Sequence, residues 1–389
     1  MTVCYNKDFP TLRKRFQLKL SAWITHWSRR KDISLSSRVQ DGRTDILSII
    51  RNFLFVALNL LRKIIDSSPR LQALLYNLRN REEFGDLYEH EKMLADSVRV
   101  NTYKRGIEKL VNPGDVILDL GTGTGILSFF AARQKPGKIY AIDHSDFIDV
   151  AKKIAKHNGL ENVEFVQTNS RNFVPGVKFD VLIHEQMGDY LFNENMIFNI
   201  LDLRDRLLKP KGKIIPGKFE LYLEPVSLKK PFSVPFLWEN QLHGVDFKFL
   251  KNDSEPLNKF KPADYKQKWL DADAADHFLC DPSPILSFDL NELKAESDIP
   301  RCIEISKKII RPGKFECFCL FFKTIFDEEI NFDTSPFSAR THWGNCFFRI
   351  EGGECSGSET VELKLFIPDL LDINKWSVTV ESFTKQDRE

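Results

Sequence analysis

The 389-residue sequence predicts an α/β protein with a doubly wound parallel sheet followed by an antiparallel, β-barrel-like domain. Two observations carry this prediction. Between residues 116 and 215, short apolar runs alternate with helical patterns, which is typical of a parallel sheet covered by helices. After residue 216, the runs alternate between apolar and polar residues or are rich in aromatic residues, which is typical of antiparallel strands.

The composition is that of a globular protein, with 42% hydrophobic residues. The 56 Lys and Arg residues nearly balance the 55 Asp and Glu residues, so the composition gives no sign of nucleic-acid binding. The seven cysteines include no Cys-x-x-Cys spacing, although Cys317 and Cys319 would share one face of a strand. We expect small buried cysteines in the cytoplasm and no metal site; zinc or a disulfide is the alternative.

Residues 1–80 are expected to form a helical extension. Its first forty residues are basic and show no secretory signal pattern, so a solvated helix is favoured over binding to a membrane surface or an acidic partner. The apolar helical stretch 46–65 is interrupted by Arg51 and Arg62, which leaves it short of the about 20 residues that span a bilayer. We therefore expect no transmembrane segment.

A glycine-rich turn marks the start of the parallel sheet. Strand 116–120 contains Asp119 and leads into Gly121, Gly123 and Gly125, and a helix follows over 126–132. Glycines allow close approach of a ligand to the backbone, and a helix start offers unpaired N–H groups.

The next strand, 138–143, ends in Asp143, about twenty residues after the turn, where an acid can accept hydrogen bonds from ribose hydroxyls. NAD remains open on this evidence, but the Gly-x-Gly-x-Gly spacing favours S-adenosylmethionine. The remaining elements are expected as helices over 82–110, 148–158 and 195–208, strands over 163–167 and 179–185, and a fifth strand opening at 213–215.

Two glutamates bracket the loop after the fourth strand. Glu185 and Glu194 are nine residues apart at the edge where ligands bind in such sheets. Paired carboxylates could hold the fork of N–H donors of a guanidinium, whereas ordinary solvated glutamates are the alternative. Far downstream, His342 stands in the segment Arg340-Thr-His-Trp343; an isolated histidine is more often a packed or surface residue.

The antiparallel domain is expected to use strands over 219–226, 303–310, 316–326, 345–350, 360–366 and 377–382, and residues 236–271 are expected to be irregular.

Four motifs, in this order, resemble the protein arginine methyltransferases, a class I S-adenosylmethionine-dependent family. They are the segments His90–Arg99, Leu118–Gly125, Glu185–Glu194 and Thr341-His342-Trp343. The segments 237–240 and 244–247 resemble the start of the family's dimerisation arm. The resemblance covers about residues 81–385.

The resemblance implies a role for each matching residue. Arg99 would pair with the methionine carboxylate of the cofactor, and Asp143 would bind its ribose. Glu185 and Glu194 would hold the substrate guanidinium, and His342, paired with Asp96, would position groups or accept a proton. Further implied cofactor contacts are His90, Met93, Asp119, Gly121, Thr122, Gly123, Gly125, Leu127, His144 and Glu185. The implied substrate site contains Phe84, Met93, Met187, Asp189 and Trp343.

Several positions depart from the family pattern. Asn80 and Phe84 stand where the family has tyrosines, and Gln186 and Asp189 replace a Trp and a Tyr. The segment 169–172 lacks the acid that the family places near adenine. Met93 together with the Thr-His-Trp motif resembles the members that make asymmetric dimethylarginine.

The resemblance implies an arginine N-methyltransferase acting on a peptide or protein, as a homodimer formed through an arm at 236–271. The expected domains are 1–80, 81–216 and 217–389. Two alternatives stay open: methylation of a small guanidine or amine metabolite, which Asp189 could favour, and a catalytically silent family member that acts as an interaction or regulatory subunit.

Overall fold

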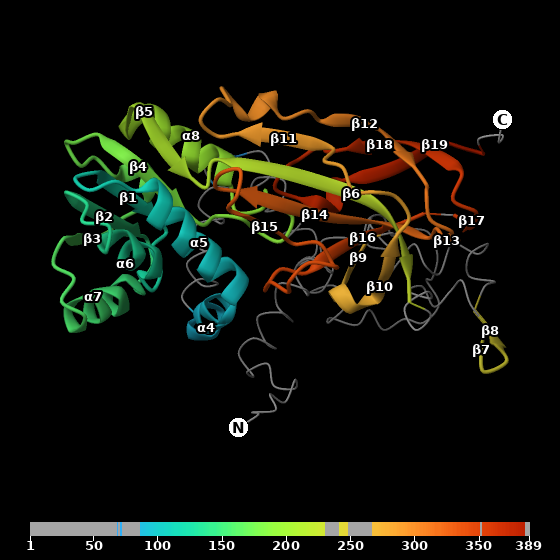
Figure 1. Cartoon of the computed structure of the whole chain (residues 1–389), viewed down its shortest axis with the longest axis horizontal. Helices are drawn as coiled ribbons and strands as arrows, with labels where there is room; N and C mark the ends of the chain where they lie inside the picture. The colour runs from blue at the N-terminus through green and yellow to red at the C-terminus, as the bar shows by residue number, and fades with distance from the viewer. Residues whose placement is uncertain are drawn as a thin grey trace, which may run out of the picture. The chain divides into compact units, whose positions relative to one another are not determined.

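The computed structural model describes Ser68, Leu71 and residues 86–229, 241–247, 267–350 and 352–385 (Figure 1). The chain divides into one compact unit of residues 1–80 with 254–262, and another of residues 81–253 with 263–389. Apart from Ser68 and Leu71, every described residue belongs to the second unit. The predicted N-terminal extension, Asn80 and Phe84 therefore lie outside the described residues. In the part of the chain that is described, no helix is long and apolar enough to cross a membrane.

The parallel sheet has five strands in the order β3-β2-β1-β4-β5, which confirms the predicted doubly wound fold. The strands are β1 (Val116–Leu120), β2 (Lys138–Asp143), β3 (Val163–Gln167), β4 (Phe179–His184) and β5 (Leu208–Ile215). The fifth strand begins earlier than predicted. Residues 209–212, which directly follow the helix predicted over 195–208, belong to β5, where the pairing with β4 shifts register between Phe179 and Val181. Lys211 adopts a left-handed φ of 67° within this irregular stretch.

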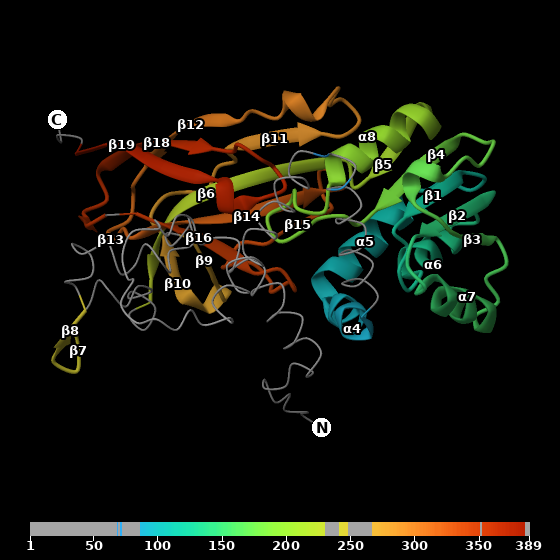
Figure 2. The same cartoon turned by 180° about the vertical axis from the view of Figure 1, so that it is seen from behind.

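Five α-helices occur among the described residues: α4 (Leu87–Ala95), α5 (Ser97–Leu110), α6 (Ile126–Ala132), α7 (Ile148–His157) and α8 (Met196–Leu207). The helical pattern predicted over 82–110 is confirmed for residues 87–95 and 97–110, but it is divided into two helices, because Asp96 leaves helical geometry between α4 and α5. Its side chain instead accepts the N–H of Arg99 and caps α5. Helix α5 contacts α6 and β5 on one side and β15 (Asn331–Asp333) on the other (Figures 1 and 2).

The second domain is built from antiparallel strands, as predicted. One sheet runs β10-β6-β14-β16-β9, with β11 paired to β6 and β15 paired to β14; a second runs β12-β18-β19, and β13-β17 and β7-β8 form separate pairs. The strands are β6 (Lys218–Leu228), β7 (Gln241–Leu242), β8 (Val245–Asp246), β9 (Gln267–Leu270), β10 (Ala275–Phe278), β11 (Leu286–Asp289), β12 (Cys302–Lys308), β13 (Gly313–Lys314), β14 (Cys317–Ile325), β16 (Asn345–Arg349), β17 (Glu354–Cys355), β18 (Glu359–Phe366) and β19 (Ser377–Lys385).

Two parts of the stretch predicted to be irregular have regular structure. Strand β9 pairs with β16, and β7 and β8 form a short hairpin. His243 and Gly244 turn this hairpin with φ angles of 49° and 84°. The boundary between the two predicted domains at 216/217 falls in the short connection between β5 and β6 and stays a prediction.

One hydrophobic core runs through both domains. It includes Ile183 of the parallel sheet and Phe322 and Trp343 of the antiparallel domain. Cys317 and Cys319 share a second, smaller cluster, as their spacing predicted. Of the six cysteines that the structure describes, all are free and only Cys302 is exposed. Among these described residues no group of three or more side chains could hold a metal ion.

Candidate active site

Acidic side chains gather at the carboxyl ends of the parallel strands. Asp119 lies in β1, Asp143 ends β2, and Glu185 follows β4 directly, one residue beyond the strand. Because neighbouring parallel strands end at the same edge of a sheet, these three carboxylates come to one side.

The glycine-rich turn between β1 and α6 is tied to the end of β2. Gly121, Gly123 and Gly125 all have left-handed φ angles, of 71°, 52° and 87°. One carboxylate oxygen of Asp143 accepts the Gly123 N–H at 2.9 Å, and the other accepts the N–H and hydroxyl of Ser145 at 2.8 and 2.7 Å. Asp143 therefore fixes the turn, while the oxygen that accepts only the Gly123 N–H keeps room for a further donor.

Helix α4 packs against this turn through His90. A Cβ added at Gly123 would come within 2.9 Å of the His90 ring, and that ring stacks on Phe147 at 3.7 Å between centroids. By contrast, a Cβ at Gly121 would meet no atom within 4 Å, so the backbone there borders open space. His144 places Nδ1 3.9 Å from Asp143, and its buried Nε2 has no partner in the described part.

Asp119 braces the turn from inside. Its side chain is fully buried, and Oδ2 accepts the hydroxyls of Thr122 at 2.7 Å and Ser128 at 2.6 Å. Its Oδ1 has no hydrogen-bond partner among the residues the structure describes. Burial raises the pKa of Asp119 to about 6, although the two hydroxyls act in the opposite direction. Leu127 is buried in the core behind the turn.

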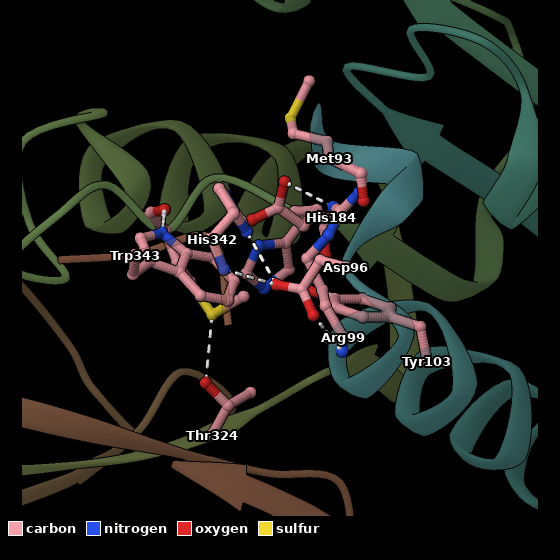
Figure 3. A network of polar contacts seen from close by, with 10 residues as sticks. Met93, Asp96, Arg99, Tyr103, His184, Thr324, His342 and Trp343 are labelled. Atoms are coloured by element: carbon pink, nitrogen blue, oxygen red, sulfur yellow. Dashed lines mark hydrogen bonds and ion pairs between the residues drawn. The ribbon is translucent and has the colours of Figure 1, made fainter. Parts of the chain in front are cut away.

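Arg99 links both helices of the N-terminal pair to the end of β4. Its Nη1 donates to a Glu185 carboxylate oxygen at 2.8 Å, and Nη2 donates to the Met93 carbonyl at 2.9 Å. The guanidinium Nε is buried and has no partner within the described ranges. Figure 3 shows the Met93 side chain extending away from this cluster.

Asp96 and His342 meet although 246 residues separate them. One oxygen of Asp96 lies 2.8 Å from His342 Nδ1 and accepts the His342 N–H at 2.9 Å (Figure 3). Burial opposes ionisation of Asp96, but the hydrogen bonds from His342 and from the Arg99 N–H outweigh it and lower the pKa of this carboxyl. The structure thus brings together the two residues that the resemblance paired.

The loop between Glu185 and Glu194 contacts the antiparallel domain through Met187. The Met187 carbonyl accepts the indole N–H of Trp343 at 2.9 Å, and its sulfur lies 3.1 Å from the Thr324 hydroxyl (Figure 3). Met187 and Trp343 are buried, whereas Asp189 is exposed.

The charges of Glu185 and Glu194 both act on the buried hydroxyl of Tyr103. Burial is the largest cause that raises the pKa of Tyr103 far above its usual value, and the charges of both glutamates add to it. The charges of both ends of the loop therefore reach the same buried hydroxyl.

The loop after β3 holds no acid. Asn169 caps the short 3₁₀ turn Ser170–Asn172 by accepting the Arg171 N–H, and Arg206 donates to the Ser170 carbonyl at 2.9 Å. The segment 169–172, which lacks the acid of the family pattern, is therefore a short turn held by hydrogen bonds from Arg171 and Arg206.

Three functional candidates escaped the sequence analysis: Tyr103, Thr324 and Tyr190. The Tyr103 hydroxyl donates to the His184 carbonyl at 2.9 Å. Its position one helical turn after Arg99 could have revealed it. Thr324 and Tyr190 carry no local signal, because their partners come from distant segments.

Comparison with known proteins agrees with this geometry. Residues 111–234 match the model of a methyltransferase domain family, and residues 218–368 match that of the arginine methyltransferase oligomerization subdomain. Protein arginine N-methyltransferase 6 of Danio rerio is 31% identical over 270 residues, which cover 67% of this chain and 76% of that protein. The chain spans less of another relative, 46% of the probable protein arginine N-methyltransferase 3 of Oryza sativa subsp. japonica, at 32% identity.

Two solved structures share the fold. A chain of the Trypanosoma brucei PRMT1 enzyme–prozyme heterotetrameric complex with AdoHcy matches with a TM-score of 0.66 and 25% identity, covering 78% of this chain and 98% of that one. The Arabidopsis thaliana protein arginine methyltransferase 10 matches with a TM-score of 0.61 and 24% identity, covering 73% and 88%.

Proposed function

Because this chain belongs to the protein arginine N-methyltransferase family, we propose that it transfers a methyl group from S-adenosylmethionine to an arginine guanidinium in a peptide or protein. The observation that carries the proposal is the position of Arg99. Its Nη1 holds Glu185 at 2.8 Å, while its buried Nε has no partner among the described residues. One guanidinium thus holds Glu185, at the start of the loop of paired glutamates, and keeps a buried donor for a further group.

The residues around the turn fit the cofactor. Arg99 Nε supplies a buried donor for the methionine carboxylate, and Asp143 keeps acceptor capacity for ribose hydroxyls. The open space beside Gly121 lets the cofactor approach the backbone. Bound here, the cofactor supplies a methyl group already activated on a positively charged sulfur. The remaining proposed contacts are His90, Met93, Asp119, Thr122, Gly123, Gly125, Leu127 and His144.

The paired glutamates supply the acceptor side. Glu185 and Glu194 would bind the substrate guanidinium through charge-assisted hydrogen bonds and hold one nitrogen in line with the methyl group. Met187 and Trp343 would wall the substrate site. If Asp96 accepts a hydrogen bond from His342 Nδ1–H, ring atom Nε2 is left as the acceptor for a proton released from the guanidinium.

The test uses isotope-labelled S-adenosylmethionine with the full chain and a panel of arginine-containing peptides and protein extracts. We expect labelled methylarginine, identified by mass spectrometry of the products. Cofactor binding with no methyl transfer to any arginine would overturn the proposal.

One observation favours a second candidate, methylation of a small guanidine. Asp189 is exposed on the loop between Glu185 and Glu194 and adds a third acid, which could bind a free α-amino group. Free arginine should then outcompete arginine peptides as the acceptor, and the mass of the product separates the two. The catalytically silent alternative predicts no cofactor binding by calorimetry at near-millimolar concentration.

The assembly we propose is a homodimer formed through an arm at residues 236–271. The support is the oligomerization subdomain matched by residues 218–368 and the β7–β8 hairpin, in which Val245 is exposed. The described cysteines are free and mostly buried, which suits the cytoplasm as the proposed location.

A further inference from the structure

The loop that joins the paired glutamates has a backbone conformation that needs outside support. Leu191 has a φ of 78° and Asn195, directly after Glu194, a φ of 58°. Asparagine tolerates the left-handed region, but leucine does not favour it, so neighbouring contacts must hold Leu191 in place. Its N–H donates to the Gly188 carbonyl at 2.9 Å, which closes a tight turn over residues 188–191.

The side chain of Tyr190 fastens this turn to the antiparallel domain. Its hydroxyl donates to the Leu371 carbonyl at 2.6 Å and accepts the Ile373 N–H at 3.3 Å. Its ring meets Trp376 edge-on at 5.6 Å, and the Trp376 indole donates to the Asp369 carbonyl at 2.7 Å. The segment 369–376 is therefore itself braced and offers a firm attachment.

The Tyr190 hydroxyl keeps its proton and can act as a donor. Burial, only partly opposed by the Ile373 hydrogen bond, raises the pKa of Tyr190 far above its usual value. The side chain is 7% exposed. A phenylalanine would fit the same space and would remove only the hydroxyl.

Hydrogen bonds tie the loop to the antiparallel domain near both Met187 and Tyr190. Met187, near Glu185, is held by Trp343 and Thr324, and Tyr190 holds the middle of the loop, four residues before Glu194. Leu191 and Phe192 are buried in the core, and the Phe192 ring stacks on Phe288 at 5.9 Å between centroids. Tyr190 adds hydrogen bonds to this apolar packing and so fixes the orientation of the turn.

We infer that Tyr190 is a positioning residue for the substrate site: by bonding to Leu371 and Ile373 it holds the turn 188–191 in its strained form and so fixes the segment that leads to Glu194. The inference rests on the proposed function, because it concerns the pair of glutamates that would bind the substrate. Tyr190 would act on the site through the loop backbone and need not touch the substrate itself.

The variant Tyr190→Phe tests this inference in the full chain. Two hydrogen bonds to the segment 369–373 are lost, so kcat/KM for an arginine peptide should fall by about 5- to 30-fold. We expect KM for the peptide to rise, while the dissociation constant of S-adenosylmethionine stays unchanged. A merely structural defect would weaken both ligands together.

Tyr222→Phe is the matched control. The Tyr222 hydroxyl also makes a short hydrogen bond, to Glu220 at 2.6 Å within β6. Tyr222 packs in the smaller hydrophobic cluster, which includes no residue of the loop 185–194. The Tyr222→Phe variant should leave the KM for the peptide unchanged. Combining Tyr190→Phe with Glu194→Asp should give less than the sum of the two effects, because both would displace the same carboxylate.

A second readout does not depend on activity. Backbone amides of residues 188–194 should exchange hydrogen faster in Tyr190→Phe than in the wild type, and Tyr222→Phe should not change them. If wild-type protein methylates nothing, the proposed function falls, but exchange still decides whether Tyr190 holds the loop. Unchanged exchange, or an unchanged peptide KM in an active enzyme, would overturn the inference.

Discussion

Replacing Asp119 by asparagine should make the protein more stable at alkaline pH than the wild type, although it replaces a fully buried carboxyl of the site by an amide. Burial raises the pKa of Asp119 from its usual 3.8 to about 6. This difference makes the ionised carboxyl about 3 kcal/mol less favourable in the folded than in the unfolded chain. The amide oxygen of asparagine can still accept the hydroxyls of Thr122 and Ser128, while its NH₂ group faces the position where Oδ1 has no partner in the described structure.

The unpartnered NH₂ group offsets part of the gain, by about 1–3 kcal/mol. The pH dependence is therefore the sharper test. Because the folded pKa is raised, folded wild-type protein holds the proton between pH 6 and 3.8, and its stability rises relative to the variant as pH falls through that window. The advantage of Asp119→Asn should shrink by about 3 kcal/mol between pH 8 and pH 4.

Urea unfolding at a series of pH values, followed by fluorescence, measures this difference. Asp180→Asn is the control of opposite sign. Burial of Asp180 is outweighed by Lys209 and by the Val116 N–H, which lower the pKa of Asp180, so this variant should lose stability at neutral pH. Parallel pH curves for wild type and Asp119→Asn would refute the reasoning.

Three further predictions concern the site and the assembly. Glu185→Gln should reduce turnover by at least about 10²-fold. Calorimetry should show little change in cofactor affinity, because Arg99 can still donate to the amide oxygen. Lost cofactor binding would argue against a substrate role for Glu185. Asp96→Asn should weaken the contact with His342 and lower kcat. Because the pKa of Asp96 is lowered in the folded protein, the stability that this carboxylate contributes should be present above pH 3.8 and vanish as the pH falls further. Urea unfolding of wild type and variant at several pH values measures this difference. Deleting residues 236–266, which leaves β9 in its sheet, should yield monomers with weak activity in light scattering and methylation assays, and a fully active monomer would exclude the arm as the dimer contact.

Local pattern was sufficient to predict the parallel sheet and the glycine-rich turn. The bounds of β2 and β3 follow from apolar runs that end in an acid or a polar residue, a signal contained in the strands themselves. The break at Asp96 was missed because the residues on both sides keep a helical pattern, and only the bonds to Arg99 and His342 reveal the cap.

Contacts between distant segments could not be predicted. Thr324 reaches Met187 across 137 residues, and Tyr190 reaches Leu371 across 181. Each contact depends on the register of strands in the antiparallel domain, which no short stretch of sequence specifies. The family resemblance supplied the pairing of Asp96 with His342, which spacing alone would not have suggested.

The core that includes Ile183, Phe322 and Trp343 has a consequence for how the molecule comes apart. Two domains with separate interiors can melt one after the other, but these share a single interior. Separating them would expose the apolar side of the sheet that carries Glu185. We therefore expect one cooperative unfolding transition, in which the site is lost as a whole and never survives on an isolated domain.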